Sequence, residues 1–145
     1  MSLYVDPTRE RFAVFRDLPS PGPIQMLNLI RFRPVAAYPD GHEQAGQNLT
    51  GAQAYRLYGR YAGPVLQRVG GRQIILARPE LTLIGPEEER WDLFFIAEYP
   101  GVDAFAAMIR DEEYRRAVVH RQAAVEDSRL VRMQPSTSGV RFGEA

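Results

Sequence analysis

The order of the expected elements restricts the fold of this chain more than any single motif does. Apolar residues recur at strand or helix spacing in separate stretches, and glycine or proline stands between most of them. The expected elements are a helix over about 7–18, a strand over 24–32, a helix from Thr50 to Gly70, strands over 72–78 and 91–99, a helical region over 102–126 with a break near Asp111, and a strand over 128–134. After the first helix, this is the β-α-β-β-α-β order of the ferredoxin-like fold.

That fold arranges four antiparallel strands in the order 4-1-3-2, so the chain is expected to be an α+β protein. The strands over 24–32 and 91–99 are the most apolar, which suits the two central positions of the sheet. Pro79 cannot donate a ladder hydrogen bond, so the strand over 72–78 belongs at an edge, with a continuation over 81–84 left open.

Local signals set several element boundaries. Asp6 is a capping residue placed before Pro7, which suits the first turn of a helix. Thr50 and Gln53 have the spacing of a capping box. Gly70 suits the left-handed conformation that ends many helices. These signals predict where the first two helices begin and where the second one ends.

The length of 145 residues fits one domain with one core. We expect the core over about 24–134, with an N-terminal helix and linker over 1–23 and a tail over 135–145 that is rich in Ser, Thr and Gly. The stretch 35–48 shows no clear period, and loops of this length often act as lids or arms.

Composition excludes several classes of function. Lys and Arg total 18 and Asp and Glu total 18, so there is no basic excess of the kind that nucleic-acid or membrane-surface proteins show. The chain has no Cys and two His, so we expect no metal and no cofactor. The N-terminus lacks the pattern of a signal peptide and no apolar run is long enough for a membrane helix, so we expect a cytoplasmic protein.

Five stretches in register resemble a family of short bacterial proteins of unknown function that belongs to the dimeric α/β-barrel superfamily. They are M-L-N-L-I-R-F (26–32), G-A-Q-A-Y-R-L-Y (51–58), W-D-L-F-F-I-A-E-Y-P (91–100), F-A-A-M-I-R-D-E-E-Y (105–114) and H-R-Q-A-A-V-E-D-S-R-L (120–130). The resemblance covers about residues 24–133, and no single stretch is specific by itself.

The resemblance implies a homodimer in which the open sheet faces of two protomers meet. A second protomer would explain why the strand over 91–99 is apolar on both faces. The superfamily includes cofactor-independent monooxygenases, haem-degrading enzymes, muconolactone isomerases and ligand-binding regulators, so the fold alone does not select a function.

Asn28 is the first candidate site residue because it lies inside an apolar strand. Its amide needs a partner, which is either a ligand oxygen, a loop or a tyrosine hydroxyl. Tyr55 and Tyr58 share one helical face and are core residues or ligand-binding residues whose hydroxyls need partners when buried.

Arg121 and His120 are the candidate catalytic residues. The guanidinium of Arg121 leaves an apolar helical face, so it binds either an anionic ligand or an internal acid such as Asp92, Glu98 or Asp127. His120 would be a general base if it faces a pocket, although exposure on the helix is the simpler expectation. His42 lies in the long loop, where it is either part of a lid or, as the simpler expectation, a loop residue without a functional role.

These residues leave the function open between two main hypotheses. The first is a cofactor-independent enzyme that acts on a small aromatic or carbonyl-bearing metabolite, with Asn28, Tyr58 and Arg121 holding polar groups. The second is a non-catalytic dimer that binds a small molecule or serves a structural role. A haem-linked role through His120 is a third and weaker hypothesis.

Overall fold

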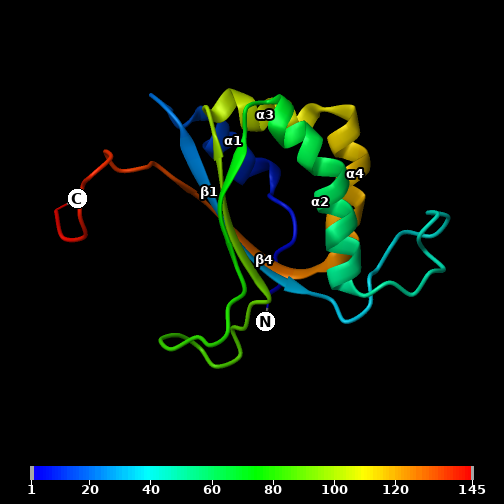
Figure 1. Ribbon diagram of the computed structural model, residues 1–145. Coiled ribbons are helices and arrows are strands. Elements are labelled where there is room, and N and C mark those ends of the chain that lie inside the picture. Colours follow the sequence, from blue (N-terminus) through cyan, green and yellow to red (C-terminus); the bar gives the residue numbers. More distant parts are fainter. Residues whose placement is uncertain (1, 145) are drawn as a thin grey trace.

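A computed structural model describes residues 2–144 of the chain. The elements follow the order expected from the sequence (Figure 1). They are α1 (Arg9–Asp17), β1 (Ile24–Phe32), α2 (Gly51–Arg68), β2 (Arg72–Ala77), β3 (Leu93–Tyr99), α3 (Val102–Arg110), α4 (Glu112–Ala124) and β4 (Val125–Met133).

The four strands form one antiparallel sheet in the order β2-β3-β1-β4. This is the expected order 4-1-3-2 read from the other edge, and it confirms the ferredoxin-like α+β fold. The two most apolar strands, β1 and β3, are central, and β2, which Pro79 follows, lies at an edge.

Helices cover one face of the sheet and leave the other face open (Figure 1). Alternate residues of β1 are buried against the helices, because successive side chains of a strand point to opposite faces. Between sheet and helices lie two apolar clusters, one around Met26, Val65 and Phe105 and one around Ile30 and Val125. The helix α1 joins the first cluster through Phe12 and Phe15.

The open face carries a continuous apolar row across all four strands. Leu27 of β1 lies opposite Ile96 of β3 and Val131 of β4, and Ile96 lies opposite Ile75 of β2. Ile75 is 45% exposed and Val131 is 48% exposed. A row of this kind at the centre of a sheet face is unusual on a surface that meets only water.

Several boundaries differ from the expected ones. The helix α1 is capped by Thr8, whose hydroxyl accepts from the N–H of Arg11, rather than by Asp6. The expected continuation of β2 over 81–84 is irregular chain, and β4 begins at Val125 rather than 128. The capping box at Thr50 and the left-handed Gly70 are confirmed, with φ of 87° at Gly70.

The connection between β1 and α2 is held to the end of α4 by backbone hydrogen bonds. The N–H of Arg33 donates to the carbonyl of Ala124, and the N–H of Ala37 donates to the carbonyl of Ala123. The rest of this loop extends past the outer side of α2 and α4 (Figure 1). The loop therefore brings its side chains over the helix layer. No helix within residues 2–144 has the length and apolarity that a membrane span requires.

Candidate functional site

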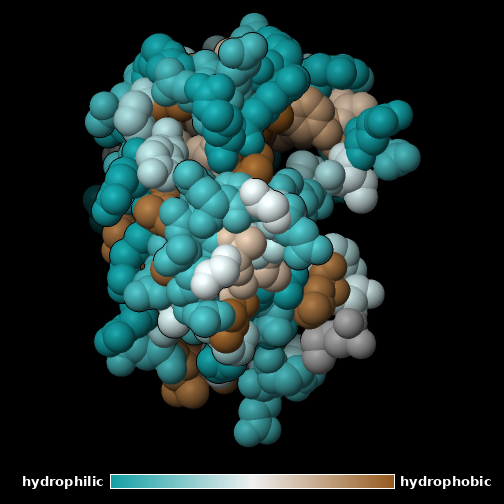
Figure 2. All heavy atoms as spheres, turned by 90° about the vertical axis from the view of Figure 1, so that its right-hand side faces the viewer, coloured by the Kyte–Doolittle hydropathy of each residue, from teal (hydrophilic) through white to brown (hydrophobic). Residues whose placement is uncertain are grey.

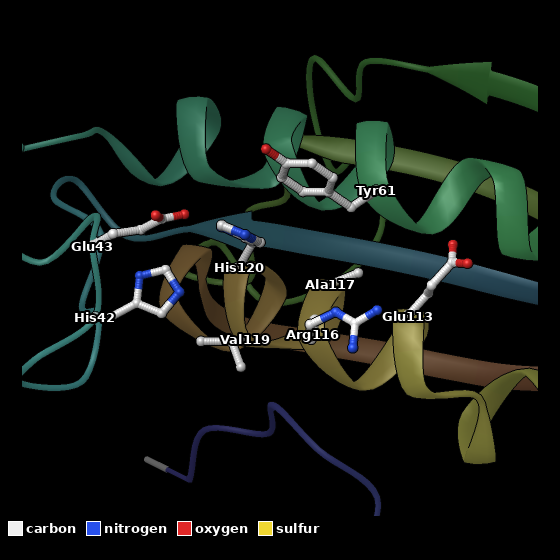
Figure 3. A pocket seen from close by; sticks show the side chains of 8 residues that line it. All are labelled: His42, Glu43, Tyr61, Glu113, Arg116, Ala117, Val119 and His120. Carbon is white, nitrogen blue, oxygen red and sulfur yellow. The ribbon is translucent and has the colours of Figure 1, made fainter.

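A cleft of about 590 Å³ lies on the outer side of the helix layer, where the β1–α2 loop meets α2 and α4 (Figure 3). Its wall on α4 is formed by Glu113, Arg116, Ala117 and His120, which lie on one helical face because their spacing is i, i+3, i+4 and i+7. Tyr61 comes from α2, and His42 and Glu43 come from the loop. Three separate segments therefore build one site.

Both histidines of the chain meet in this cleft. The ring centroids of His42 and His120 are 5.5 Å apart, and the two rings are nearly perpendicular. Tyr38 stacks on His42 with centroids 4.8 Å apart, and Tyr61 stacks on His120 with centroids 5.3 Å apart. The four aromatic rings thus form one cluster, of which His42, Tyr61 and His120 line the cleft.

His120 is held in place by a short hydrogen bond. Its Nδ1 lies 2.6 Å from the hydroxyl oxygen of Tyr38, and its side chain is only 6% exposed. Burial lowers the pKa of His120, the neighbouring His42 lowers it further, and Glu43 opposes both effects. The lowered pKa favours the neutral form of His120. The burial of its side chain corrects the expectation that this residue is exposed.

His42 is oriented by its own loop. The backbone N–H of Gln44 donates to Nδ1 of His42 over 3.1 Å. In Figure 3 the edge of the His42 ring that lies away from the loop backbone is turned toward His120 and Val119, and so into the cleft. The loop thus presents the histidine in a defined orientation rather than as a free surface group.

The charged groups of the cleft are separated along its length. Glu43 lies at the loop end and Arg116 lies toward the other end in Figure 3. The carboxylate of Glu113 lies 3.7 Å from Arg68, whose nearer partner is Asp111 at 2.6 Å. None of the ion pairs within residues 2–144 involves Arg116 or Glu43. No group of three or more metal-binding side chains occurs in the described part of the chain.

Seen from the helix side, the surface is mostly hydrophilic, and apolar side chains form separate small patches (Figure 2). A surface of this kind differs from the open sheet face, where one apolar row crosses four strands. The helix side is therefore suited to a small ligand in a cleft rather than to a broad protein interface.

Asn28 lies in the interior, 8% exposed, and its Nδ2 donates to the carbonyl of Met26 on the same strand over 3.1 Å. The expected tyrosine or loop partner is not the one observed. Tyr58 shares a hydrogen bond of 3.0 Å with the hydroxyl of Tyr114. The buried hydroxyl of Tyr55 has no hydrogen-bond partner among the described residues. Burial raises the pKa of both Tyr55 and Tyr58, so both phenols stay neutral.

Arg121 points to the N-terminal segment and not into the cleft. Its Nη1 donates to the carbonyl of Val5 over 2.6 Å and lies 3.8 Å from the carboxylate of Asp6, while its Nη2 donates to Ser128. The internal acid is therefore Asp6, and none of the three acids expected from the sequence is the partner. His120 and Arg121 are neighbours in sequence but face different surroundings.

The residues that sequence reasoning did not single out are Tyr38, Glu43, Tyr61 and Arg116. One signal was present, because Arg116 precedes His120 by four residues and must share its helical face. The contribution of Tyr38 had no such signal, because it depends on how the loop folds back over α4.

Comparison with known proteins agrees with this fold. Two crystal structures of RPA0582, described as a protein of unknown function from Rhodopseudomonas palustris, are 57% and 56% identical, with TM-scores of 0.88 and 0.87. They cover 96% and 94% of this chain and 99% of their own chains. No curated protein matches the chain. Residues 45–134 match the family described as "Domain of unknown function (DUF1330)", and the chain belongs to this family.

Proposed function

We propose that the cleft around His120 binds a small aromatic or carbonyl-bearing metabolite and moves a proton on it without a cofactor. The observation that carries this proposal is the hydrogen bond that Tyr38 makes with His120, a residue of the cleft lining. A neutral histidine whose position is fixed by a hydrogen bond meets the usual requirements for a general base.

The tautomer of His120 decides whether it acts as this base. If Nδ1 carries the hydrogen and donates to the oxygen of Tyr38, then Nε2 keeps a free lone pair and can accept a proton from the substrate. If Tyr38 donates instead, Nε2 carries the hydrogen and the cleft binds without accepting a proton. The enzyme hypothesis and the binding hypothesis therefore differ in which ring nitrogen of His120 carries the hydrogen.

In this proposal Arg121 has a structural role. Its donors bind Val5 and Ser128, so it holds the N-terminal segment against α4 and β4 rather than a substrate oxygen. The interior residues Asn28, Tyr55 and Tyr58 pack between the sheet and the helices beneath the cleft wall. They support α2 and α4, which position Tyr61 and His120.

The test is a measurement of carbon–hydrogen exchange. The protein is mixed in D2O with a panel of small aryl ketones and keto acids, and NMR follows the loss of hydrogen next to the carbonyl. We expect faster exchange with the wild type than with His120→Gln. Arg60→Gln changes an exposed residue of α2 that does not line the cleft, and as the control it should leave the exchange unchanged. Binding without exchange would support the non-catalytic hypothesis, and no binding of any compound would contradict both.

We also propose that two copies associate through the open sheet face. The apolar row of Ile75, Ile96, Leu27 and Val131 supports a second copy as the partner, since the face is open in the single chain. The cleft is lined by α2, α4 and the β1–α2 loop, and these elements lie on the side of the sheet away from this face (Figure 1), so a dimer would leave the cleft accessible. The dimer and the small-molecule site are therefore compatible.

A further inference from the structure

We infer that the ligand of the cleft is an aromatic carboxylate with a second acceptor oxygen. Its carboxylate would lie on Arg116 and its second oxygen would accept a hydrogen bond from His42. This inference rests on the proposed function, because it names the class of molecule that the same cleft would take.

The role of His42 follows from its backbone partner. A backbone N–H can only donate, so the hydrogen bond from Gln44 requires a lone pair on Nδ1 of His42. In the neutral ring, the hydrogen is then on Nε2. The edge of the ring that faces the cleft therefore presents an N–H donor, which rules out Nε2 of the neutral ring as a base or as a metal ligand.

The ring stacking keeps this donor in place. Tyr38 lies parallel to His42 with an interplanar angle of 20°, and the same tyrosine holds His120 through its hydroxyl. One residue thus fixes the orientation of both histidines. A donor that is oriented before binding loses little conformational entropy when a ligand oxygen arrives.

Arg116 gives the cleft an available positive charge. Arg68 binds Asp111 over 2.6 Å and lies 3.7 Å from Glu113, one turn before Arg116 on α4, so Arg68 offsets part of the charge of Glu113. None of the ion pairs among residues 2–144 involves Arg116. A planar guanidinium binds a carboxylate through two parallel hydrogen bonds. Glu43 lies at the opposite end of the cleft and would repel a carboxylate there, so the acid group is directed to Arg116 (Figure 3).

The aromatic part of the ligand follows from the surface between these two donors. Tyr61 and His120 are stacked with an interplanar angle of 30°, and Val119 supplies a small apolar side chain beside them. A flat ring can pack against such a surface with favourable geometry. A ring with an oxygen substituent at each end therefore matches the order of donor, apolar surface and cation.

Three probes that share one ring separate the possible ligand classes. They are 4-hydroxybenzoate, 4-hydroxybenzamide and 4-hydroxybenzylamine, which are an anion, a neutral molecule and a cation. Titration followed by amide NMR shifts reports both the affinity and the place of binding. We expect the acid to bind about tenfold more tightly than the other two, as one charged hydrogen-bonding contact would give.

Matched variants assign the contacts. Arg116→Gln should remove the preference for the acid, while Arg115→Gln, the exposed neighbour on the same helix that does not line the cleft, should keep it. His42→Phe preserves a ring that can stack on Tyr38 but removes the donor, and it should weaken binding of all three probes.

The outcomes separate this inference from the proposed function. If the amide or the amine binds in the cleft as tightly as the acid, the inference about the carboxylate is wrong and the small-molecule site remains. The same conclusion follows if Arg115→Gln and Arg116→Gln weaken binding of 4-hydroxybenzoate equally. If none of the three probes shifts the amides of the cleft, both this inference and binding of aromatic metabolites are contradicted.

Discussion

The hydroxyl oxygen of Tyr38 lies 2.6 Å from Nδ1 of His120, and this contact ties the β1–α2 loop to the last turns of α4. Tyr38→Phe removes the bond and keeps the ring. We expect the free energy of unfolding to fall by about 0.5–1.5 kcal/mol, as for a typical hydrogen bond. Urea unfolding measures this change, and two-bond ¹H–¹⁵N correlation spectra of the wild type show which ring nitrogen carries the hydrogen.

Tyr61→Phe is the matched control for that variant. Tyr61 also stacks on His120, but its hydroxyl makes no hydrogen bond to the described residues. Its removal should therefore leave stability nearly unchanged. Equal stability of the two variants would show that the Tyr38–His120 bond does not stabilise the fold.

The lowered pKa of His120 predicts a dependence of stability on pH. Burial keeps the folded-state pKa below the ordinary value of 6.5, so the unfolded chain binds a proton at a higher pH than the folded chain does. The free energy of unfolding should consequently fall as the pH is lowered from 6.5 toward the folded-state pKa of His120. Above about pH 7, titration of His120 should no longer change the free energy of unfolding. Urea unfolding from pH 5 to 8 should show a smaller slope for His120→Gln, and identical slopes would contradict this origin.

The fold was largely predictable because its signals are local. The apolar strands β1 and β3, the proline after β2 and the capping box at Thr50 each follow from a few neighbouring residues. The start of β4 was misplaced because α4 ends at Ala124 and the strand begins at Val125, with no glycine or proline between them to mark the change.

The site was less predictable because it depends on contacts between distant segments. His42 and His120 meet because backbone hydrogen bonds attach the loop to the end of α4, as in the bond from Ala37 to Ala123. Backbone donors and acceptors are the same in nearly every residue, so no side-chain pattern predicts these hydrogen bonds between the loop and α4. The loop also covers His120, which explains why a helical pattern alone indicated exposure.

The contacts of Arg121 predict that its substitution lowers the stability of the fold rather than the affinity for a ligand. Arg121→Met retains much of the apolar stem but leaves the carbonyl of Val5 and the hydroxyl of Ser128 without this donor. We expect a loss of about 1–3 kcal/mol and faster hydrogen exchange around Val5. A variant of wild-type stability that has lost ligand binding would instead place Arg121 in the binding site.

Gly51, at the start of α2, is a second position where the helix layer closely approaches the β1–α2 loop. A methyl group there would collide with the backbone carbonyls of Arg33 and Ala124, so Gly51→Ala should destabilise the fold by about 1–3 kcal/mol. Gly59→Ala on the same helix has open space and should stabilise the protein by about 0.5–1 kcal/mol. Thermal unfolding of both variants checks the opposite signs, and a shift of the same sign would contradict the close approach at Gly51.

The apolar row on the open sheet face predicts that the protein is a dimer whose contacts centre on Ile96. An aspartate at this position would bury an unpaired charge in the interface, so Ile96→Asp should convert a dimer to a monomer in light scattering at matched concentration. Leu83→Asp, in an irregular segment where the leucine is 86% exposed, provides the control with the same added charge. If the wild type is a monomer, or if both variants remain dimeric, association through the centre of this face is contradicted.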